Sequence, residues 1–597
     1  MILQSLRDYY ARAQLSPPGW ELKAIPFFVV LQPDGCVVSV VSRVDKDNPR
    51  GSPVLVPQSE IRSGKNAWAQ PNLLWDHYGF VLGEPKRKPN GEMDPSDTYE
   101  KAERQRGAFV ERIESLRLKY PESRGLIAVS NFYARGEYKK IFARPDAVEI
   151  AKIPGANLTF RLFDEIEPVL HEAWIQKLIS SDAPSSEDID TNDVAKSAIC
   201  LATGDHTEIA RLHPKIYRVC SKPTALAAAN SKEAPAYSSY GKDQGFIFPI
   251  GKSAAFAYAT ALNYLLRKDS PQRMQVGDAS TVFWAERQDP FESIFGDIFQ
   301  DNPDASTAAV RALLDAVHSG HWGPSDETLR YHVLGLAPNA ARISIRFYHC
   351  VTLRELGQRI AQHFEDLSLA RGPNDPQYPS LKRLLQAVCL TTKTQPFGDI
   401  DRLPPALGGA VVDAILAGPD VPYPSLWLNA AVGRCRAERA VNYLRAAAIK
   451  ACLNRQIRFR HGTEKEFLPM LDLSNTHPAY RLGRLFAVLE KIQEEASGGG
   501  LNATIRDRYY GAASSTPVAV FTTVLRLKNA HLKKLAPGRV AWFEKLLGEV
   551  LGPLSDFPKH LPLPDQGRFA LGYYHQRQDF FTRKPQDTPD TPEGEPA

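Results

Sequence analysis

Cysteine, methionine and long apolar runs are all scarce in this sequence. Its seven cysteines among 597 residues include no CxxC pair, so neither a disulfide framework nor a common zinc motif is indicated. With no signal-peptide pattern at the start, this cysteine usage favours a reducing cytoplasm. No apolar stretch approaches the roughly 18 residues that a membrane-spanning helix needs, so we expect a soluble, cytoplasmic protein.

A strong charge of either sign is also missing. The net charge is +5 at pH 7 and the isoelectric point is near 8.6, so any nucleic-acid surface must come from local basic patches. Residues 585–597 contain four acidic residues and no basic one, which predicts an acidic disordered tail.

Familiar catalytic motifs are absent as well. There is no GxSxG, no HExxH and no phosphate-binding loop, and "SYGKDQG" (239–245) lacks the length and the Ser or Thr of such a loop. Cys200, His206, His213 and Cys220 could supply a tetrahedral metal site, but their spacing fits no known finger, which favours separate core and loop residues. His318 and His321 are favoured as ordinary turn residues. We therefore expect no enzyme, no metal and no cofactor.

The hydrophobic periodicity predicts an α+β protein. Two apolar runs around Pro33-Asp34-Gly35 predict a β-hairpin over 24–44. Strands are also predicted over 124–133, 148–163, 280–286 and 341–351, and helices over 1–13, 99–120, 173–180, 252–267, 303–320 and 352–369. Residues 180–193 are expected to form an acidic flexible insert. Beyond 375 the pattern becomes helical, which predicts a mixed α/β domain with hairpins and amphipathic helices at 1–370 and an all-helical domain at 375–584.

The last part of the helical domain has a pattern of its own. Helices are predicted from Pro478 to about 497, and over 501–513, 517–535, 538–551 and 565–583, which suggests an autonomous bundle at 470–584. This segment holds sixteen Lys and Arg against ten Asp and Glu. Its basic residues suit contacts with single-strand phosphates, although a solvated basic face is an equal alternative. The candidates are Arg481, Arg484, Arg506, Arg508, Arg526, Lys528, Lys533 and Lys534.

Hydrogen-bond donors gather in the segment 62–72. Arg62, Lys65, Asn66, Trp68 and Asn72 combine a phosphate-neutralising charge, base-reading amides and one aromatic ring. Residue types alone favour an ordinary polar surface loop over a DNA-reading one.

Several segments, taken together in one order along the chain, carry a resemblance. They are "MILQSLRDYY" (1–10) with "LSPPGW" (15–20), "RSGKNAWAQPNLLWDHYGFVLG" (62–83), "CLATGDHTEIARLHPKI" (200–216), "SSYGKDQGFIFPIGKSAAFAYATALNYLL" (238–266), "STVFWAE" (280–286), "LGLAPNAARISIRF" (334–347) and "AYRLGRLFAVLEKIQ" (479–493). With them the chain resembles the large subunit of the type I-C CRISPR Cascade complex, an RNA-guided DNA-surveillance assembly.

The resemblance implies a binding subunit of antiviral defence. Its N-terminal domain is expected to recognise the PAM of target duplex and to help separate the strands, and its helical domain to guide the displaced strand in the R-loop. The implied partners are the crRNA-containing backbone subunits, a small subunit, target double-stranded DNA and a recruited helicase-nuclease.

The same resemblance sharpens the candidate residues. Lys65, Asn66 and Asn72 are expected near PAM bases and Arg62 on a phosphate, whereas Trp68 either stacks on the opened duplex or anchors the loop. Lys242 and Gln244 form a second DNA-facing candidate, with a structural turn as the alternative.

Met470 suggests a second translation start. Codons for Lys465-Glu466 can spell a bacterial ribosome-binding sequence, and three residues separate this pair from Met470. Because the resemblance implies a small subunit made within the same gene, we predict a product comprising 470–597. A chance methionine in a linker is the alternative.

Overall fold

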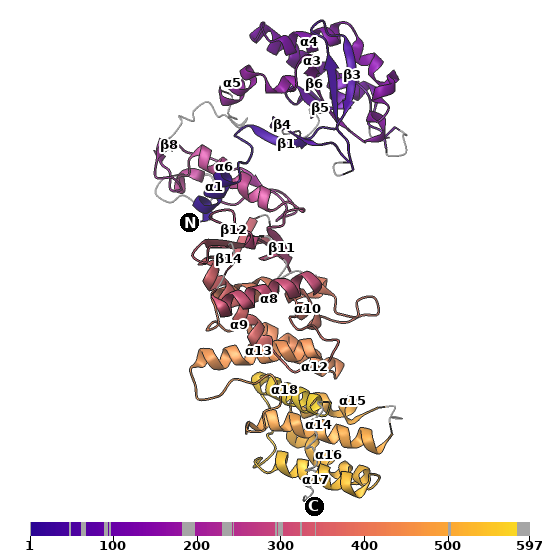
Figure 1. Cartoon of the computed structure of the whole chain (residues 1–597), viewed down its shortest axis with the longest axis vertical. Helices are drawn as coiled ribbons and strands as arrows, with labels where there is room; N and C mark the ends of the chain where they lie inside the picture. The colour runs from indigo at the N-terminus through magenta and orange to yellow at the C-terminus, as the bar shows by residue number, and fades with distance from the viewer. Residues whose placement is uncertain are drawn as a thin grey trace, which may run out of the picture.

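The computed structural model shows an elongated molecule in which successive bodies stack along the long axis (Figure 1). It describes residues 2–46, 49–60, 62, 67–88, 93–94, 97–181, 197–229, 242, 244–292, 295–296, 303–320, 322, 325–340, 342–498 and 503–581. The predicted acidic insert, apart from 180–181, and the acidic tail lie outside these residues. The buried hydrophobic residues form three clusters, which define an upper body, a middle body and a helical body.

The upper body is built around a four-stranded sheet of order β3-β2-β6-β5. β2 pairs in parallel with β6, and the other pairings are antiparallel. All five residues of β2 are buried, as expected of a central strand flanked on both sides. The strands are β1 (Trp20–Ala24), β2 (Phe27–Leu31), β3 (Val37–Ser42), β4 (Pro53–Pro57), β5 (Trp75–His77) and β6 (Asn157–Leu162). β1 and β4 form a separate antiparallel ribbon.

The helices and 3₁₀ turns of this body confirm some predictions and correct two. They are α2 (Tyr78–Leu82), α3 (Tyr99–Lys119), α4 (Arg124–Ala134) and α5 (Ala173–Ser181), with 3₁₀ turns η1 (Ala67–Ala69), η2 (Glu137–Ala143), η3 (Pro145–Ala147), η4 (Ile150–Lys152) and η5 (Val169–His171). The predicted hairpin forms as β2–β3. The strand predicted over 124–133 is wrong, since this segment is α4. The strand predicted over 148–163 forms only in its second half, as β6, because η4 occupies the first half. Ser123 caps α4 by accepting a hydrogen bond from the backbone N–H of Leu126, and Leu126, Val129 and Phe132 recur at helical spacing.

The N-terminal helix belongs to the middle body rather than the upper one. α1 (Ile2–Arg12) packs against α6 (Lys252–Leu265), and the Tyr9 ring lies 6.5 Å from that of Trp284. The upper body is therefore inserted after α1, and the chain returns to the middle body at residue 197. Short antiparallel pairs and a 3₁₀ turn complete it: β7 (Ser197–Ile199) with β8 (His206–Glu208), β9 (Lys215–Ile216) with β10 (Thr224–Ala225), and η6 (Gln244–Ile247).

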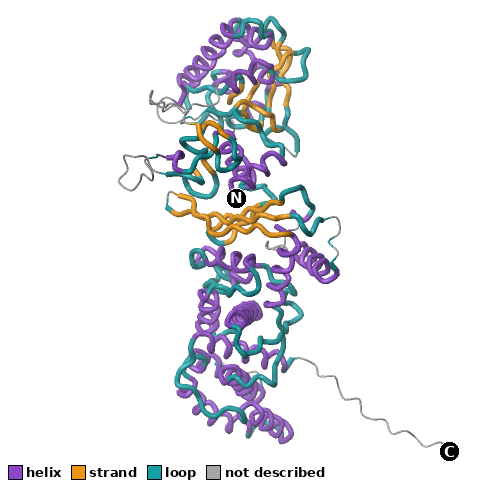
Figure 2. Tube along the Cα trace, turned by 90° about the vertical axis from the view of Figure 1, so that its left-hand side faces the viewer, coloured by secondary structure: helices purple, strands orange, loops and turns teal. Residues whose placement is uncertain are grey.

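A second four-stranded sheet separates the middle body from the helices. Its antiparallel strands are β11 (Arg273–Val276), β12 (Ala279–Ala285), β13 (Arg330–Asn339) and β14 (Arg342–Thr352). Every residue of β12 is buried. Val282 and Trp284 join the cluster under α1 and α6, whereas Phe283 and Ala285 join the helical cluster. Figure 2 shows this sheet crossing the molecule, with the helices below it.

The helical body follows the sheet. α9 (Leu353–Leu367) packs against the sheet and against α8 (Pro303–Ser319), and the part of the chain described beyond residue 375 contains no strand, as predicted. The remaining elements are α10 (Leu381–Ala387), η7 (Ile400–Arg402), α11 (Leu407–Ala417), α12 (Ser425–Glu438), α13 (Tyr443–Arg460), α14 (Pro478–Ala496), α15 (Ile505–Ala513), α16 (Pro517–Leu532), α17 (Pro537–Leu551) and α18 (Leu563–Asp579). All five predicted C-terminal helices form.

α14 is the central helix of the C-terminal bundle, α14–α18. It packs most closely with α18, and the crossing depends on two glycines. A Cβ on Gly483 would stand 2.0 Å from the Phe569 carbonyl oxygen, and one on Gly572 would stand 2.1 Å from the Tyr480 carbonyl oxygen. These glycines let the two backbones approach, so α14 is covered along most of its length.

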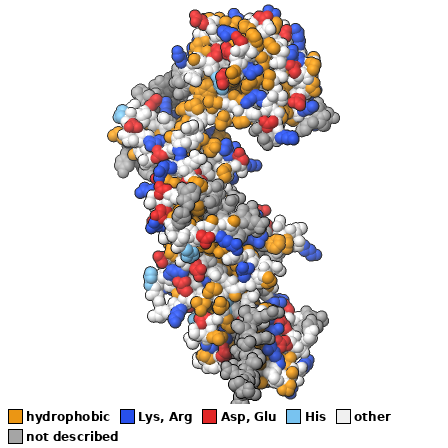
Figure 3. Space-filling view, viewed as in Figure 1, with side chains coloured by type: hydrophobic (Ala, Val, Ile, Leu, Met, Phe, Trp, Pro, Cys, Tyr) orange, Lys and Arg blue, Asp and Glu red, His pale blue; other side chains and the backbone are white. Residues whose placement is uncertain are grey.

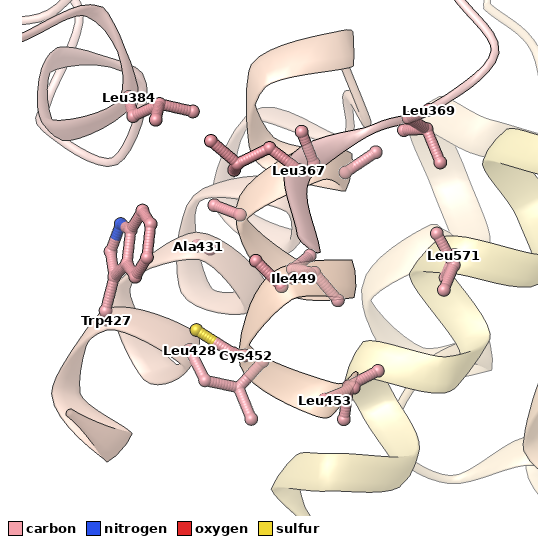
Figure 4. Close-up of a cluster of buried hydrophobic side chains, with 14 of the residues drawn as sticks. Leu367, Leu369, Leu384, Trp427, Leu428, Ala431, Ile449, Cys452, Leu453 and Leu571 are labelled. Carbon is pink, nitrogen blue, oxygen red and sulfur yellow. The ribbon is translucent and has the colours of Figure 1, made fainter. Parts of the chain in front are cut away.

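The hydrophobic core runs unbroken through both predicted domain boundaries. One cluster extends from Met274 to Tyr574. Figure 4 shows Leu571 of α18 in one cluster with buried side chains of α9, α12 and α13. The Arg568 guanidinium pairs with Glu464, which precedes Met470. The bundle that begins near Met470 therefore shares its core with the preceding helices.

Candidate nucleic-acid interface

The first candidate loop connects β4 to β5 and is closed at its base by a ladder of hydrogen bonds. The Trp75 indole donates to the Pro57 carbonyl at 2.9 Å, the Glu60 N–H donates to the Asn72 side-chain oxygen at 2.9 Å, and Arg62 Nε donates to the Gln70 carbonyl at 2.7 Å. These bonds cross-link successively closer positions of the two arms. The described part of the tip is η1, which packs against α3.

Asp76, on β5, lies where the two arms meet. Its carboxylate is 1% exposed and accepts hydrogen bonds from both terminal nitrogens of Arg62 and from the backbone N–H groups of Asn72 and His77. Burial raises the pKa of the Asp76 carboxyl, and the Arg62 charge opposes that rise. The same burial lowers the pKa of the neighbouring His77 to about 3, so this imidazole is neutral at pH 7.

These contacts change the roles expected of Arg62 and Asn72. The Arg62 guanidinium also stacks on Phe80, with its carbon 4.1 Å from the ring centroid, so its donors are turned into the protein. Asn72 is 4% exposed, and its side-chain oxygen already accepts a hydrogen bond from Glu60. In this conformation neither side chain presents its polar atoms to DNA, and both hold the loop.

Trp68 is the most exposed of the three residues of the set that the structure describes. It lies within η1, and 36% of its surface is accessible. Of the two predicted roles for Trp68, stacking fits this exposure better than anchoring in the core. Lys65 and Asn66 lie outside the described residues, so their predicted base contacts stay predictions.

The second candidate, around Lys242 and Gln244, combines one exposed and one structural residue. Lys242 is exposed. The Gln244 side-chain oxygen accepts a hydrogen bond from Arg211 at 2.8 Å, and its backbone has a positive φ of 46°. Gly245 approaches so closely that a Cβ there would stand 2.1 Å from the Ala210 carbonyl oxygen. Gln244 thus serves the turn before α6, which was the structural alternative.

The basic residues predicted to bind the displaced strand differ in burial from one helix of the C-terminal bundle to another. Arg484 of α14 is fully buried: its Nε donates to Gln576, and a terminal nitrogen contacts Glu549 at 3.0 Å. Arg481, 5% exposed, donates to the carbonyl oxygens of Glu549 and Val550 at the end of α17. The predicted displaced-strand contacts of these two arginines are incompatible with their burial. Apolar periodicity placed α14 correctly but missed that every side of this helix is covered.

The exposed members of the predicted set lie on α15, on α16 and directly after α16. Arg508, Arg526, Lys533 and Lys534 are exposed. Lys528 is paired with Glu544 at 2.9 Å, and Arg506 lies 3.6 Å from the buried Glu490. Positive and negative side chains are interspersed on the face drawn in Figure 3, which is hollowed below the upper body. The candidates for a strand on the bundle surface therefore reduce to Arg508, Arg526, Lys533 and Lys534.

The four residues considered for a metal are not brought together. His213 is buried against the Tyr258 hydroxyl at 2.7 Å, and the Cys220 thiol lies 3.3 Å from the Arg342 carbonyl. His206 is exposed on β8, and Cys200 is buried beside Gly251. Nowhere in the described residues do three His, Cys, Asp or Glu side chains meet in a way that could hold a metal ion. His318 bonds to the Leu314 carbonyl, and His321 lies outside the described residues.

Asp76 and Arg112 are the residues of this site that sequence reasoning missed. The Arg112 guanidinium, on α3, contacts Glu60 at 2.8 Å and also the Pro71 carbonyl. One signal was available for Asp76: a single carboxylate within the apolar run "LLWDHYGFVL" (73–82) needs a buried partner.

The chain matches one known protein family over nearly its whole length. A family model described as CRISPR-associated protein (Cas_Csd1) matches residues 6–581. No curated protein matches the chain. Among the described residues, no helix is both long enough and apolar enough to cross a membrane.

Proposed function

The chain belongs to the Cas_Csd1 family of CRISPR-associated proteins, a type I-C family, and we propose that it is the large subunit of an RNA-guided surveillance complex, Cascade. The observation that carries this proposal is the family match over residues 6–581. In this role the subunit recognises the PAM of target duplex, aids strand separation, stabilises the R-loop and supports recruitment of a separate helicase-nuclease in antiviral defence. It binds and scaffolds rather than catalyses.

The turn bearing Trp68 supports a DNA contact in the upper body. Guide pairing reads the target sequence in such complexes, so the protein needs only a small surface that meets the duplex at the PAM. An exposed indole on a turn closed at its base provides a flat face for a base at an opened duplex end. Lys65 and Asn66, in the same loop, would supply phosphate and base-edge contacts.

Trp68→Ala tests this contact. We expect the assembled complex to lose roughly tenfold in affinity for PAM-bearing duplex, because an aromatic stacking partner of one base is removed. Affinity for an unpaired complementary strand, which needs no duplex opening, should stay at the wild-type value. Equal duplex affinity for wild type and variant at matched salt would refute the contact.

A DNA-binding protein that acts without a guide is the competing function. Purification under native conditions separates the two. The Cascade proposal requires a short RNA and backbone subunits to co-purify with the chain, whereas a stand-alone protein carries neither.

The exposed basic residues of α15 and α16 support a second DNA contact. Arg508, Arg526, Lys533 and Lys534 would neutralise phosphates of the displaced strand without reading its sequence. Such contacts stabilise the R-loop by holding one of its two separated strands.

We also propose that Met470 starts a separate small subunit comprising 470–597. Met470 is 64% exposed in the connection between α13 and α14, so the start falls between helices. Silent recoding of codons 465–466 should abolish a C-terminal fragment of this size while the full-length chain persists. A fragment that survives the recoding, or that never forms, refutes the second start.

A further inference from the structure

We propose that Asp76 is a positioning residue that sets the orientation of the Trp68 turn, residues 67–69. The inference rests on the DNA contact proposed above and adds the residue that holds the contacting turn in place. It concerns only Glu60, Arg62, the segment 67–72, Asp76 and their described contacts.

Asp76 joins the two arms of the loop at one anion. Arg62 lies before the turn and Asn72 follows it, and both donate to the same carboxylate. Asp76 is itself fixed in β5, which pairs with β6 through Trp75 and Thr159. Asp76 therefore fixes the positions of both arms relative to the central sheet of the upper body.

A carboxylate suits this position better than an amide. Two ionised oxygens can accept the two Arg62 nitrogens and the two backbone N–H groups at once. An amide of the same shape replaces one accepting oxygen with a donor, which would face the N–H groups. Asp76→Asn therefore loosens both arms with almost no change of volume.

Asp76 acts through other residues. At 1% exposure it is out of reach of any DNA, and it influences Trp68 only through the arms that flank η1. A role confined to folding would weaken the whole subunit, whereas a positioning role weakens only functions that use the turn.

The experiment compares three variants in complexes reconstituted with guide RNA: Asp76→Asn, Trp68→Ala and the control Glu172→Gln. Glu172 is a second carboxylate that ties parts of the upper body together, accepting from Gly125 N, Ser123 Oγ and Trp174 Nε1. Each complex is measured for assembly, for affinity to PAM-bearing duplex and for affinity to an unpaired complementary strand.

We expect Asp76→Asn to weaken duplex binding roughly tenfold, as for Trp68→Ala, and to leave assembly and unpaired-strand binding unchanged. The double variant should bind duplex no more weakly than Trp68→Ala alone, because both changes remove the same contact. Glu172→Gln should retain wild-type duplex affinity. Hydrogen exchange of the backbone over 67–72 should speed up in Asp76→Asn while β2 and β6 keep their protection.

The measurements distinguish a failure of the Asp76 positioning role from a failure of the Trp68 DNA contact. If Trp68→Ala weakens duplex binding but Asp76→Asn does not, the positioning role is overturned and the contact stands. If Asp76→Asn weakens assembly or unpaired-strand binding as well, its role is only structural. If Trp68→Ala has no effect, the DNA contact itself fails. Should Asp76→Asn not fold, Arg62→Gln breaks the same ion pair from its partly exposed partner and is subject to the same outcomes.

Discussion

The upper body and the C-terminal bundle both carry side chains proposed to meet DNA. In each region some predicted arginines bond inside the protein, but the arginine of the upper body stays partly exposed and those of the bundle are buried. In the upper body Arg62 holds the base of a loop, and the exposed candidate is the aromatic Trp68. In the bundle Arg481 and Arg484 connect α14 to α17 and α18, and the exposed candidates are basic residues of α15 and α16.

Several arginines of the chain serve its core rather than its surface. The guanidinium offers five donors in a fixed plane, so it can bond several carbonyl and carboxylate oxygens inside the protein. Arg455, with no exposed surface, bonds Asp366 and the carbonyl oxygens of Ala414 and Gly418. Counting basic residues in a segment therefore overestimates its DNA-binding surface when many of them are arginines on central helices.

The largest expected effect is the loss of unfolding free energy when a buried arginine of the bundle, rather than an exposed one, is replaced. Arg484→Ala removes a fully buried side chain and leaves Gln576 and Glu549 without their partner. We expect a loss of about 3 kcal/mol or more in unfolding free energy, from the cavity and the unpaired amide together. Arg526→Ala, at an exposed position of α16, should change it by less than about 0.5 kcal/mol. Thermal unfolding of the full chain measures both, and similar losses would contradict the assignment of Arg484 to the core.

Sequence patterns predicted most of the secondary structure because apolar periodicity and helix-start signals are local. Pro478 begins α14 as expected, and the His477 ring nitrogen accepts the Ala479 N–H as its cap. The pattern of 124–133 misled because its apolar residues are buried on most sides, which obscures the helical period.

The candidate site was predictable only in part. Residue types located the loop and Trp68, and the partners of Arg62 and Asn72 lie nearby in the sequence. Other contacts of the candidate residues come from positions whose proximity depends on the fold. Arg112 lies 41 residues from its Pro71 contact, and Gln576 lies 92 residues from Arg484. No local signal marks such pairs.

The second-largest expected effect is a loss of stability at low pH, to which one buried histidine in each region contributes. Burial lowers the pKa of His77 in the upper body and of His575 in the bundle to about 3. Below pH 6.5 the unfolded chain binds a proton at each of these residues and the folded chain does not. Each histidine therefore costs about 1.4 kcal/mol of stability per pH unit as the pH falls from 6.5.

Replacing either histidine measures how much that residue contributes to the loss of unfolding free energy at low pH. Unfolding free energies of wild type, His77→Gln and His575→Gln between pH 7 and pH 5 should show a shallower decline in each variant. Glutamine keeps a side-chain acceptor for the Gly79 N–H in one site and for the Tyr480 hydroxyl in the other. A decline as steep as that of wild type would show that the replaced imidazole is protonated in the folded protein.

The variant with the smallest expected effect on stability gives the most direct test of displaced-strand binding. Lys533 and Lys534 are exposed at the end of α16, whereas Lys528 is 16% exposed and paired with Glu544. We expect Lys533→Ala/Lys534→Ala to change the unfolding free energy by less than about 0.5 kcal/mol. The double variant should lower the slope of log affinity against log salt by about 0.7 for each single-strand phosphate that the protein no longer neutralises.

Lys528→Ala is the matched control on the same helix. Its charge is already compensated by Glu544, so its removal should alter the salt slope for displaced-strand binding less than removal of the exposed pair does. The measurement uses the assembled complex with an R-loop substrate at several salt concentrations. If the exposed pair contributes nothing, the end of α16 is not where the displaced strand lies, and Arg508 and Arg526 are the predicted contacts left to test. If Lys528 contributes as much as each exposed lysine, its pairing with Glu544 does not keep it from the strand.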